Sequence, residues 1–380
     1  MTMANILCYG KILPEERSPT QVSFDKNSEM KALKFISKEN LQLVDVPEPE
    51  PGSRQVKIKV KQAGICGTDL HQYTDGPIGL LRRPIPIAEK VIRHITLGHE
   101  FSGEITKIAP DISEFQPGDR VAVQPLIPCG QCKYCREGKP SLCSDVVFLG
   151  LNDDGAFAEY IVAPVNTINK LPDSMSYEQA AFCEPLAVSV HGVRMGKVSL
   201  GSTVAITGAG TIGLLAMQAA LAAGASKVFI IEPIAKRRDL ALRLGASAVF
   251  NPLQDDVSKE IAKLTGGIRA DVTIEAAGSQ NAMLITTGTT ARGGIIVQLG
   301  VMEGSCDFPF AQLWGREQTI SPSAAYDIDF PIALDLLARQ KVIVDPLISS
   351  KISLETIIDK GFRELSGPNR SDYIKILVSP

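Results

Sequence analysis

The feature that most limits the fold of this chain is a glycine-rich turn placed between a short apolar strand and a helix. The turn reads Gly208-Ala-Gly210-Thr-Ile-Gly213 and follows the strand-like run 203–207. In such turns the first glycine allows a tight bend, the second lets a pyrophosphate approach the backbone, and the third lets helix and strand pack closely. A second strand-like run ends in Glu232, about 20 residues further on. The pattern predicts a dinucleotide-binding βαβ unit.

Strand-like and helix-like segments continue to alternate after this turn. Such alternation predicts a doubly wound α/β domain with a parallel sheet. Glu232 can accept hydrogen bonds from both ribose hydroxyls and would repel a 2′-phosphate, which favours NAD over NADP. Lys236, Arg237 and Arg238 lie just beyond it and leave NADP open, unless they form a solvated helix face. Strands are expected at 203–207, 227–232, 248–250, 271–275, 294–299 and 318–325, and helices near 214–223, 234–244, 256–264 and 280–291.

The first half of the chain has a different pattern, with closely spaced short strands and turns. Residues 1–29 show no clear period and are assigned no fold. The globular part is expected to begin at Met30, just before the first strand, and Pro47 and Pro49 are expected to end the second strand. Such spacing predicts an antiparallel, barrel-like domain, which the tail 373–378 is expected to rejoin after a helix at 328–340. The strands are expected at 31–36, 41–46, 56–60, 101–108, 121–123 and 155–162.

Four cysteines crowd into one short segment, and this is a strong metal signal. They are Cys129, Cys132, Cys135 and Cys143. Four thiolates can close around a tetrahedral zinc ion and leave no position for chemistry. An iron–sulfur cluster is the rival, but the last spacing is not the short ferredoxin spacing and no proline follows Cys143. A nucleic-acid zinc knuckle would need more basic and aromatic surroundings.

A second set of metal-binding side chains is scattered along the chain. Cys66 follows a strand-like run and should lie on a loop. His99 and Glu100 would point to opposite sides of a regular strand, so they share a metal only if the chain turns at Gly98. Glu184 stands among apolar residues, so it is either paired or metal-linked, or else it is an exposed residue at a helix start.

Length and charge narrow the class of protein further. A chain of 380 residues is long for one core and is expected to form two domains. A net charge of −3 gives no reason to expect nucleic acid or an anionic membrane as partner. Eight cysteines, half of them in one cluster and without a secretory signal, indicate a reducing compartment. We therefore expect a soluble, cytoplasmic protein.

These motifs occur together in the order seen in zinc-containing medium-chain dehydrogenases. The resemblance covers about Met30 to Pro380, and it is closest to the polyol branch, which includes 2,3-butanediol and sorbitol dehydrogenases. Residues 1–29 and part of 80–95 depart from the pattern of that branch, which puts the substrate rather than the chemistry in doubt. The motifs are Gly64-Ile-Cys66-Gly67-Thr68-Asp69-Leu70-His71, Gly98-His99-Glu100, the four cysteines, Glu184-Pro185-Leu186 and the glycine-rich turn.

The resemblance implies a fold, an activity and cofactors. The fold would be a GroES-like antiparallel β-barrel catalytic domain at 30–190, completed by 328–380, with a Rossmann domain at 191–327 and an extension at 1–29. The enzyme would transfer a hydride between a secondary alcohol, such as a vicinal diol or polyol, and NAD, giving the ketone. It would bind two zinc ions per chain and form a homodimer or homotetramer.

The resemblance also implies roles for single residues. Thr68 would take the alcohol proton and pass it towards His71, which is otherwise a surface histidine. Glu184 would bind the catalytic zinc directly or hold its water. Three alternatives stay open. The chain could be a sorbitol- or threonine-type dehydrogenase, or an enzyme that acts on a larger metabolite in a pocket shaped by residues 72–97. It could also be a non-catalytic protein of the same fold. The implied ligands are Cys66, His99 and Glu100 for the catalytic zinc, the four clustered cysteines for a structural zinc, and Gly208, Gly210, Ile212, Gly213, Glu232 and Arg237 for the cofactor, with Arg237 over the adenine or near a phosphate.

Overall fold

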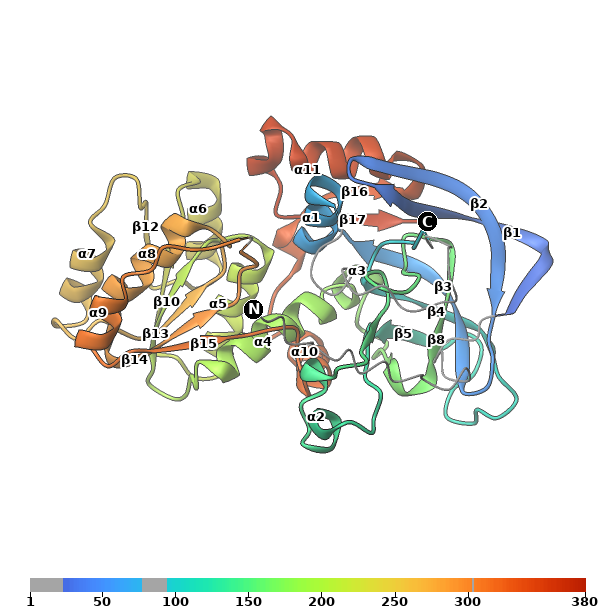
Figure 1. Ribbon diagram of the computed structural model, residues 1–380, viewed down its shortest axis with the longest axis horizontal. Helices are drawn as coiled ribbons and strands as arrows, with labels where there is room; N and C mark the ends of the chain where they lie inside the picture. Colours follow the sequence, from blue (N-terminus) through green and yellow to red (C-terminus); the bar gives the residue numbers. More distant parts are fainter. Residues whose placement is uncertain (1–22, 77–93, 303) are drawn as a thin grey trace, which may run out of the picture.

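The structure is a computed structural model that describes residues 23–76, 94–302 and 304–380. Figure 1 shows two lobes, with the helices α4 (Cys183–Met195) and α10 (Asp329–Ala338) between them. We call the lobe built on β10 to β15 the parallel-sheet lobe and the other the barrel lobe. Among the described residues, every helix is too short or too polar to cross a membrane.

The parallel-sheet lobe contains a six-stranded sheet in the order β12-β11-β10-β13-β14-β15, and every pair in it is parallel. This order confirms the predicted doubly wound domain, including its sixth strand. The strands are β10 (Thr203–Thr207), β11 (Lys227–Ile231), β12 (Ala248–Phe250), β13 (Ala270–Glu275), β14 (Thr290–Gln298) and β15 (Thr319–Pro322). The helices are α5 (Thr211–Ala222), α6 (Ala235–Arg243), α7 (Val257–Leu264), α8 (Gln280–Thr289) and α9 (Phe310–Gly315).

The barrel lobe is built on a seven-stranded sheet in the order β16-β17-β3-β4-β5-β9, with β8 also paired to β3. Its pairs are antiparallel except for β16 with β17. The expected return of the chain end is confirmed, because Leu377 of β17 pairs with Gly64 of β3. The strands are β3 (Gln55–Gly64), β4 (Glu100–Ile108), β5 (Arg120–Val123), β6 (Leu126–Ile127), β7 (Val147–Phe148), β8 (Tyr160–Pro164), β9 (Ile168–Lys170), β16 (Ile348–Ser353) and β17 (Lys375–Ser379). The helices are α1 (Gly67–Asp75), α2 (Lys133–Arg136), α3 (Tyr177–Ala180) and α11 (Glu364–Ser366).

The first two strands differ from the expectation. β1 (Ser23–Ser37) starts seven residues before Met30, and β2 (Asn40–Glu50) continues through Pro47 and Pro49. The two strands form a separate antiparallel ribbon, interrupted by a bulge between Asp25 and Glu29. Proline is tolerated here because β2 belongs to a two-stranded ribbon and is therefore an edge strand. The bulge hides the alternation that would have marked the earlier start.

One apolar core joins the two lobes. Phe182 and Leu186 of the α4 region are fully buried in the same cluster as Leu214 of α5 and Phe330 of α10. Ordinary burial of such side chains stabilises a fold by about 1.5–3 kcal/mol each. The α4 helix is therefore fixed against both lobes, and it holds Glu184 in a constant place relative to the glycine-rich turn.

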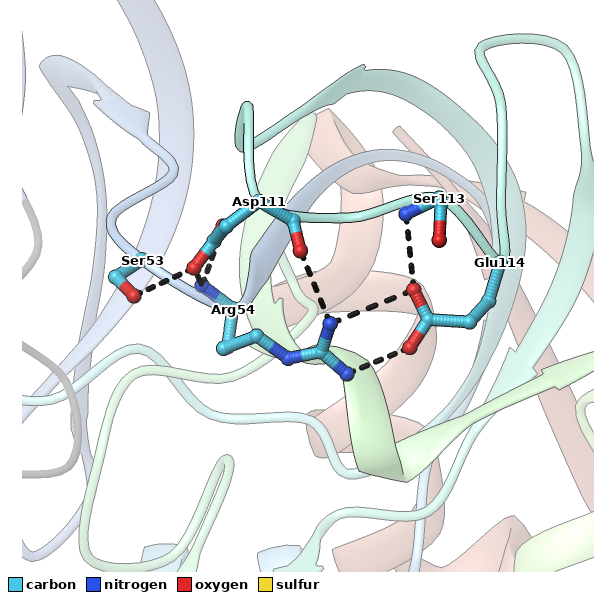
Figure 2. Close-up of polar contacts among 5 residues, drawn as sticks. All are labelled: Ser53, Arg54, Asp111, Ser113 and Glu114. Carbon is cyan, nitrogen blue, oxygen red and sulfur yellow. Dashed lines mark hydrogen bonds and ion pairs between the residues drawn. The ribbon is translucent and has the colours of Figure 1, made fainter.

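A polar cluster fixes the outer turns of the barrel lobe. Figure 2 shows Arg54 between Asp111 and Glu114. The Arg54 Nη2 atom donates to Glu114 Oε1 over 2.6 Å, and Ser53 Oγ donates to Asp111 Oδ2 over 2.7 Å. The turn between β2 and β3 is thereby tied to the loop that follows β4. The Arg54 guanidinium, followed by backbone amides, lowers the pKa of Glu114 to about 2.

Candidate functional site

Cys66 lies where β3 ends and α1 begins. Its backbone N–H donates to Asp69 Oδ2 over 3.0 Å, so the first turn of α1 fixes the orientation of the loop. The positive end of the helix dipole favours negative charge at this position. The Thr68 hydroxyl lies 3.6 Å from Cys66 Sγ. Cys66 is therefore on a loop, as predicted, and Thr68 stands beside it.

His99 and Glu100 reach the same side of the chain because the backbone turns at Gly98. Gly98 has a φ of +93°, and β4 begins only at Glu100. Ligand atoms of Cys66, His99 and Glu100 all lie within 4.8 Å of one another. A Cβ at position 98 would lie 2.8 Å from Phe157, so both the positive φ and the close packing require glycine. The condition for His99 and Glu100 to share a metal, a turn of the chain at Gly98, is met.

Asp69 lies behind His99. The His99 Nδ1 atom is 3.5 Å from Asp69 Oδ1, and both side chains are buried. Burial disfavours the charged imidazole, but the negative charges of Asp69 and Cys66 outweigh burial and raise the pKa of His99 well above its ordinary value. The surroundings of His99 thus favour positive charge in this cluster, which either a proton or a metal ion could supply.

Glu100 is held by a buried lysine from the far end of the chain. Lys375 Nζ forms an ion pair with Glu100 Oε2 and donates to the carbonyl oxygen of Ile65 over 3.0 Å. The second carboxylate oxygen, Glu100 Oε1, is buried without a hydrogen-bond partner. An orphaned carboxylate oxygen of this kind costs free energy unless a ligand satisfies it. Glu100 therefore has one oxygen available for a metal.

Glu184 stands in the first turn of α4 and is buried. Burial raises its pKa to about 8, with the charge of Glu100 adding to the increase and that of His99 opposing it. It lies outside the group of three whose ligand atoms are within 4.8 Å. Tyr326 is also buried nearby: its hydroxyl has no hydrogen-bond partner, and burial followed by the charge of Glu184 raises its pKa.

The side chains of this site carry a surplus of acidic groups. Asp69, Glu100 and Glu184 are buried, the Cys66 thiol beside them is half-buried, and the buried Lys375 contributes a permanent positive charge. A thiolate, an imidazole and a carboxylate are the donor set that zinc prefers. The donor types, their spacing and the orphaned oxygen of Glu100 therefore fit a divalent metal ion.

The four-cysteine lobe forms a second candidate metal centre. The four sulfur atoms lie within 4.8 Å of one another, and none of the four forms a disulfide. The amide of Cys135 donates to Cys132 Sγ over 3.4 Å, and this bond is the main reason that the pKa of Cys132 is lowered to about 6. Burial raises the pKa of Cys143 to about 12. Four converging sulfurs with amide donors suit a closed tetrahedral zinc site.

The glycine-rich turn has the geometry that a phosphate needs. Gly208 has a φ of +93°, and a Cβ at Gly213 would lie 2.0 Å from the Gly208 carbonyl oxygen. Around Gly210, in contrast, nothing lies within 4 Å of the position a Cβ would take. The α5 helix starts directly after Gly210, so its free N–H groups face this open space. The backbone leaves room where a pyrophosphate would approach.

Glu232 follows the end of β11 and supports the same turn. Its Oε2 atom accepts from the Ala209 amide over 2.7 Å, and Oε1 accepts from the Ile234 amide over 3.0 Å. The carboxylate is buried, and each oxygen keeps a further lone pair for a ligand. Ile212, in the first turn of α5, is half-buried against the core that joins the lobes.

Two further predicted residues have contacts that the sequence did not indicate. Arg237 donates to the carbonyl oxygens of Tyr373 and Arg370, and its Nε is buried without a partner. Its proposed contact with adenine or phosphate stays a prediction. His71 is 38% exposed, and its Nδ1 lies 3.3 Å from Asp75 Oδ2.

Some of the predicted site lies outside the described residues, and some of the observed site was not predicted. Most of the segment expected to shape the substrate pocket, residues 77–93, is not described. Asp69, Tyr326 and Lys375 are partners that sequence reasoning missed. Lys375 carried a signal, since a lysine inside the apolar strand 373–378 needs a buried counter-charge.

Comparison with known proteins agrees with this geometry. Residues 52–173 match the alcohol dehydrogenase GroES-like domain, and residues 211–339 match the zinc-binding dehydrogenase family. The chain is 35% identical over 353 residues to (R,R)-butanediol dehydrogenase of Bacillus subtilis (strain 168), covering 92% of this chain and 100% of that protein. It is also 35% identical over 355 residues to sorbitol dehydrogenase of the same organism, covering 92% and 97%.

The solved structures give the same answer. A protein from Sinorhizobium meliloti 1021, solved with NADP bound, superposes with a TM-score of 0.84 at 34% identity and covers 93% of this chain and 100% of that one. The expected fold class, a GroES-like barrel with a Rossmann sheet, is confirmed. A fold shared along nearly the whole length, with both candidate metal centres and the glycine-rich turn in place, leaves one conclusion: the chain belongs to the zinc-binding alcohol dehydrogenase family.

Proposed function

We propose that this chain is a zinc-dependent dehydrogenase that transfers a hydride between a secondary alcohol and NAD, with a vicinal diol such as 2,3-butanediol or a polyol as substrate. The observation that carries this proposal is the convergence of the half-buried Cys66 with the buried His99 and Glu100, whose ligand atoms all lie within 4.8 Å of one another. The two relatives named for butanediol and sorbitol support a small polyhydroxylated substrate.

The residues of the site have distinct roles in this proposal. Cys66, His99 and Glu100 would hold the catalytic zinc, which supplies a Lewis acid that lowers the pKa of the alcohol and stabilises negative charge on oxygen. Glu184 is buried in the first turn of α4 close to these ligands, so its carboxyl group would position a water or substrate hydroxyl. The four cysteines would hold a second, structural zinc.

A proton path can start at Thr68. Its hydroxyl lies beside Cys66 and can accept the alcohol proton, because a hydroxyl both donates and accepts hydrogen bonds. His71 follows one turn later on α1 and is partly exposed, so it can release the proton to solvent. Replacing His71 by Gln should therefore lower the turnover rate at low pH. The same substitution should change the affinity for coenzyme less.

The coenzyme side of the proposal is a preference for NAD. Glu232 occupies the end of β11 with its negative charge, which would repel a 2′-phosphate. The cations next to it are engaged elsewhere: Lys236 pairs with Asp372 over 2.8 Å, and Arg238 donates to the carbonyl oxygens of Glu232 and Pro233. One structural relative binds NADP, so the two coenzymes need to be compared directly.

The proposal includes a cytoplasmic homodimer or homotetramer, with domain boundaries near 191 and 327. Among the described strands, β15 pairs only with β14 and forms one edge of the six-stranded sheet. In α9, which precedes β15 in the chain, Phe310 is 66% and Trp314 84% exposed. Pairing of two such edges would cover these side chains. Trp314→Glu should then lower the mass measured by light scattering.

The experiment that tests the proposed function measures zinc per chain and NADH absorbance with 2,3-butanediol stereoisomers, sorbitol, xylitol and threonine, using NAD and NADP in parallel. Two zinc ions and diol turnover are expected. Cys66→Ala and His99→Ala should abolish turnover and leave NAD binding intact. Cys306→Ala, a half-buried cysteine of the parallel-sheet lobe, is the matched control. Retained turnover in Cys66→Ala would refute the zinc chemistry.

A further inference from the structure

A hollow lies on the parallel-sheet lobe, away from the candidate metal centres of the barrel lobe. It has a volume of about 310 Å³, and its charged lining consists of Arg269, Arg292 and Arg316. Three guanidinium groups around one small hollow concentrate positive charge in a protein whose net charge is −3. The proposed dehydrogenase chemistry uses none of these residues.

The hollow lies where the parallel strands begin, which is the end of the sheet opposite the glycine-rich turn. Arg269 directly precedes β13, Arg292 lies in the first residues of β14, and Arg316 shortly precedes β15. Because these strands are parallel, their first residues lie at the same end of the sheet. The glycine-rich turn follows the other end of β10, which is parallel to β13. A dinucleotide on that turn and a ligand in this hollow would therefore occupy separate sites.

Each arginine is oriented by a neutral partner. Arg269 Nε donates to the carbonyl oxygen of Gly288 over 2.7 Å, and Arg292 Nη1 to that of Gly315 over 3.0 Å. Arg316 Nη1 donates to the carbonyl oxygen of Thr287. These bonds use one of the five N–H donors of each guanidinium.

The charges of the three arginines are left without acidic partners. Within the described ranges, no carboxylate forms an ion pair with any of them, although Asp271 and Glu317 are close in sequence. The Asp271 carboxylate instead accepts from the Thr203 amide over 2.8 Å. Burial, followed by repulsion from Arg269 and Arg292, lowers the pKa of Arg316. The hollow therefore has free donors and uncompensated positive charge.

The backbone also departs from regular geometry to present two of these side chains. Arg269 has a φ of +80°, a left-handed conformation that side chains other than glycine rarely adopt. Arg292 lies on a bulge of β14: between the pairs Ala270–Thr290 and Val272–Ile295, four residues of β14 stand opposite a single residue of β13. Strain of this kind persists where the surroundings enforce it, and it is concentrated at functional sites.

We propose that this three-arginine pocket binds a small phosphate-bearing anion at a site separate from the coenzyme site. The planar guanidinium fork matches phosphate oxygens in pairs, and three forks suit a group that presents several charged oxygens in different directions. A dicarboxylate shares this oxyanion chemistry but offers fewer charged oxygens at each centre. We therefore expect phosphate to bind more tightly than a dicarboxylate of similar size.

The test is a calorimetric titration of the zinc-loaded, full-length protein with inorganic phosphate, at low ionic strength and with NAD at saturation so that the coenzyme site is occupied. One phosphate per chain is expected. Arg292→Gln, an exposed position, should weaken binding at least about tenfold, in line with the loss of one charge-assisted contact. Arg339→Gln is the matched control, since it removes an equal charge from a 70% exposed arginine at the end of α10; its binding should be unchanged.

Two further titrations, one with a second variant and one with a second anion, test the role of the guanidinium fork and the preference for phosphate. Arg316→Lys keeps the charge and loses the fork, so an affinity between those of the native protein and Arg292→Gln is expected. Malonate replaces phosphate in the second titration and should bind more weakly. The proposal is overturned by an absence of phosphate binding in the NAD-saturated protein, by undiminished binding in Arg292→Gln, or by malonate binding as tightly as phosphate. Because the readout is binding, it is independent of whether the proposed alcohol chemistry is correct.

Discussion

The buried pair of Lys375 and Glu100 allows a quantitative prediction. Their side chains are 2% and 1% exposed, so neither charge has access to water. Replacing Lys375 by Met leaves the Glu100 carboxylate buried without its counter-charge, and breaking such a pair costs about 3–5 kcal/mol. We expect this loss in metal-free protein, and a smaller loss when zinc is present, because a dication at Glu100 would replace the missing positive charge.

The assay is urea unfolding followed by far-ultraviolet circular dichroism, since the single tryptophan, Trp314, lies in α9 and reports only on the parallel-sheet lobe. A double-mutant cycle with Glu100→Gln isolates the pair: the double variant should cost less than the sum of the single variants by about 2 kcal/mol or more. Lys351→Met is the control, because its 2.7 Å pair with Glu178 leaves Lys351 53% exposed, and such pairs contribute at most about 1 kcal/mol.

Two results would refute this reasoning. The first is strict additivity in the cycle, which would mean that the two charges do not interact in solution. The second is a cost for Lys375→Met no larger than for Lys351→Met, which would mean that the Glu100 carboxylate remains hydrated or becomes protonated without penalty. An unchanged cost on adding zinc would separately argue against a metal ion at Glu100.

Three further predictions follow from local geometry. Gly213→Ala places a Cβ against a backbone carbonyl, so it should lower the midpoint temperature of thermal unfolding. Gly210→Ala has space for its Cβ, so it should keep that midpoint and weaken NAD binding. Equal midpoints in the two variants would contradict this. Arg54 lowers the pKa of Glu114 to about 2. The Glu114 carboxylate therefore stabilises the fold at pH values above its pKa in the unfolded chain, and this contribution is lost as pH falls through about 2. A Glu114 carboxyl signal that titrates near 4.5 in carbon-detected NMR would contradict this prediction. Removing the metal from the lobe 129–143 should make that lobe protease-sensitive while the parallel-sheet lobe stays resistant, and an unchanged cleavage pattern would argue against a structural metal.

The sequence predicted best what depends on short stretches of chain. The turn at Gly208 to Gly213 and its neighbouring strands and helix could be located because the motif is local: Gly208 and Gly213 answer steric demands, and Gly210 leaves open space. The four-cysteine lobe is also local. The start of β1 was wrong because a bulge between Asp25 and Glu29 breaks the alternation on which such a prediction depends.

The parts that could not be predicted depend on distant segments meeting. Lys375 reaches Glu100 only because β17 pairs with β3. Arg237 contacts the Tyr373 carbonyl because α6 lies against the returning chain. No spacing in the sequence indicates such encounters. The three-arginine pocket is of the same kind, since its members are brought together by the parallel register of three strands.

The return of the chain end to the barrel lobe has a consequence for synthesis on the ribosome. The parallel-sheet lobe ends its last strand at Pro322, so it can fold while the remainder is still being translated. The barrel lobe starts earlier but lacks β17 until residue 379 has emerged, and until then Glu100 is without Lys375. The lobe that is made first is therefore finished last, and the end of β3 at Ala63 and Gly64, which pairs with β17, is the part of its sheet that a nascent-chain chaperone would need to protect.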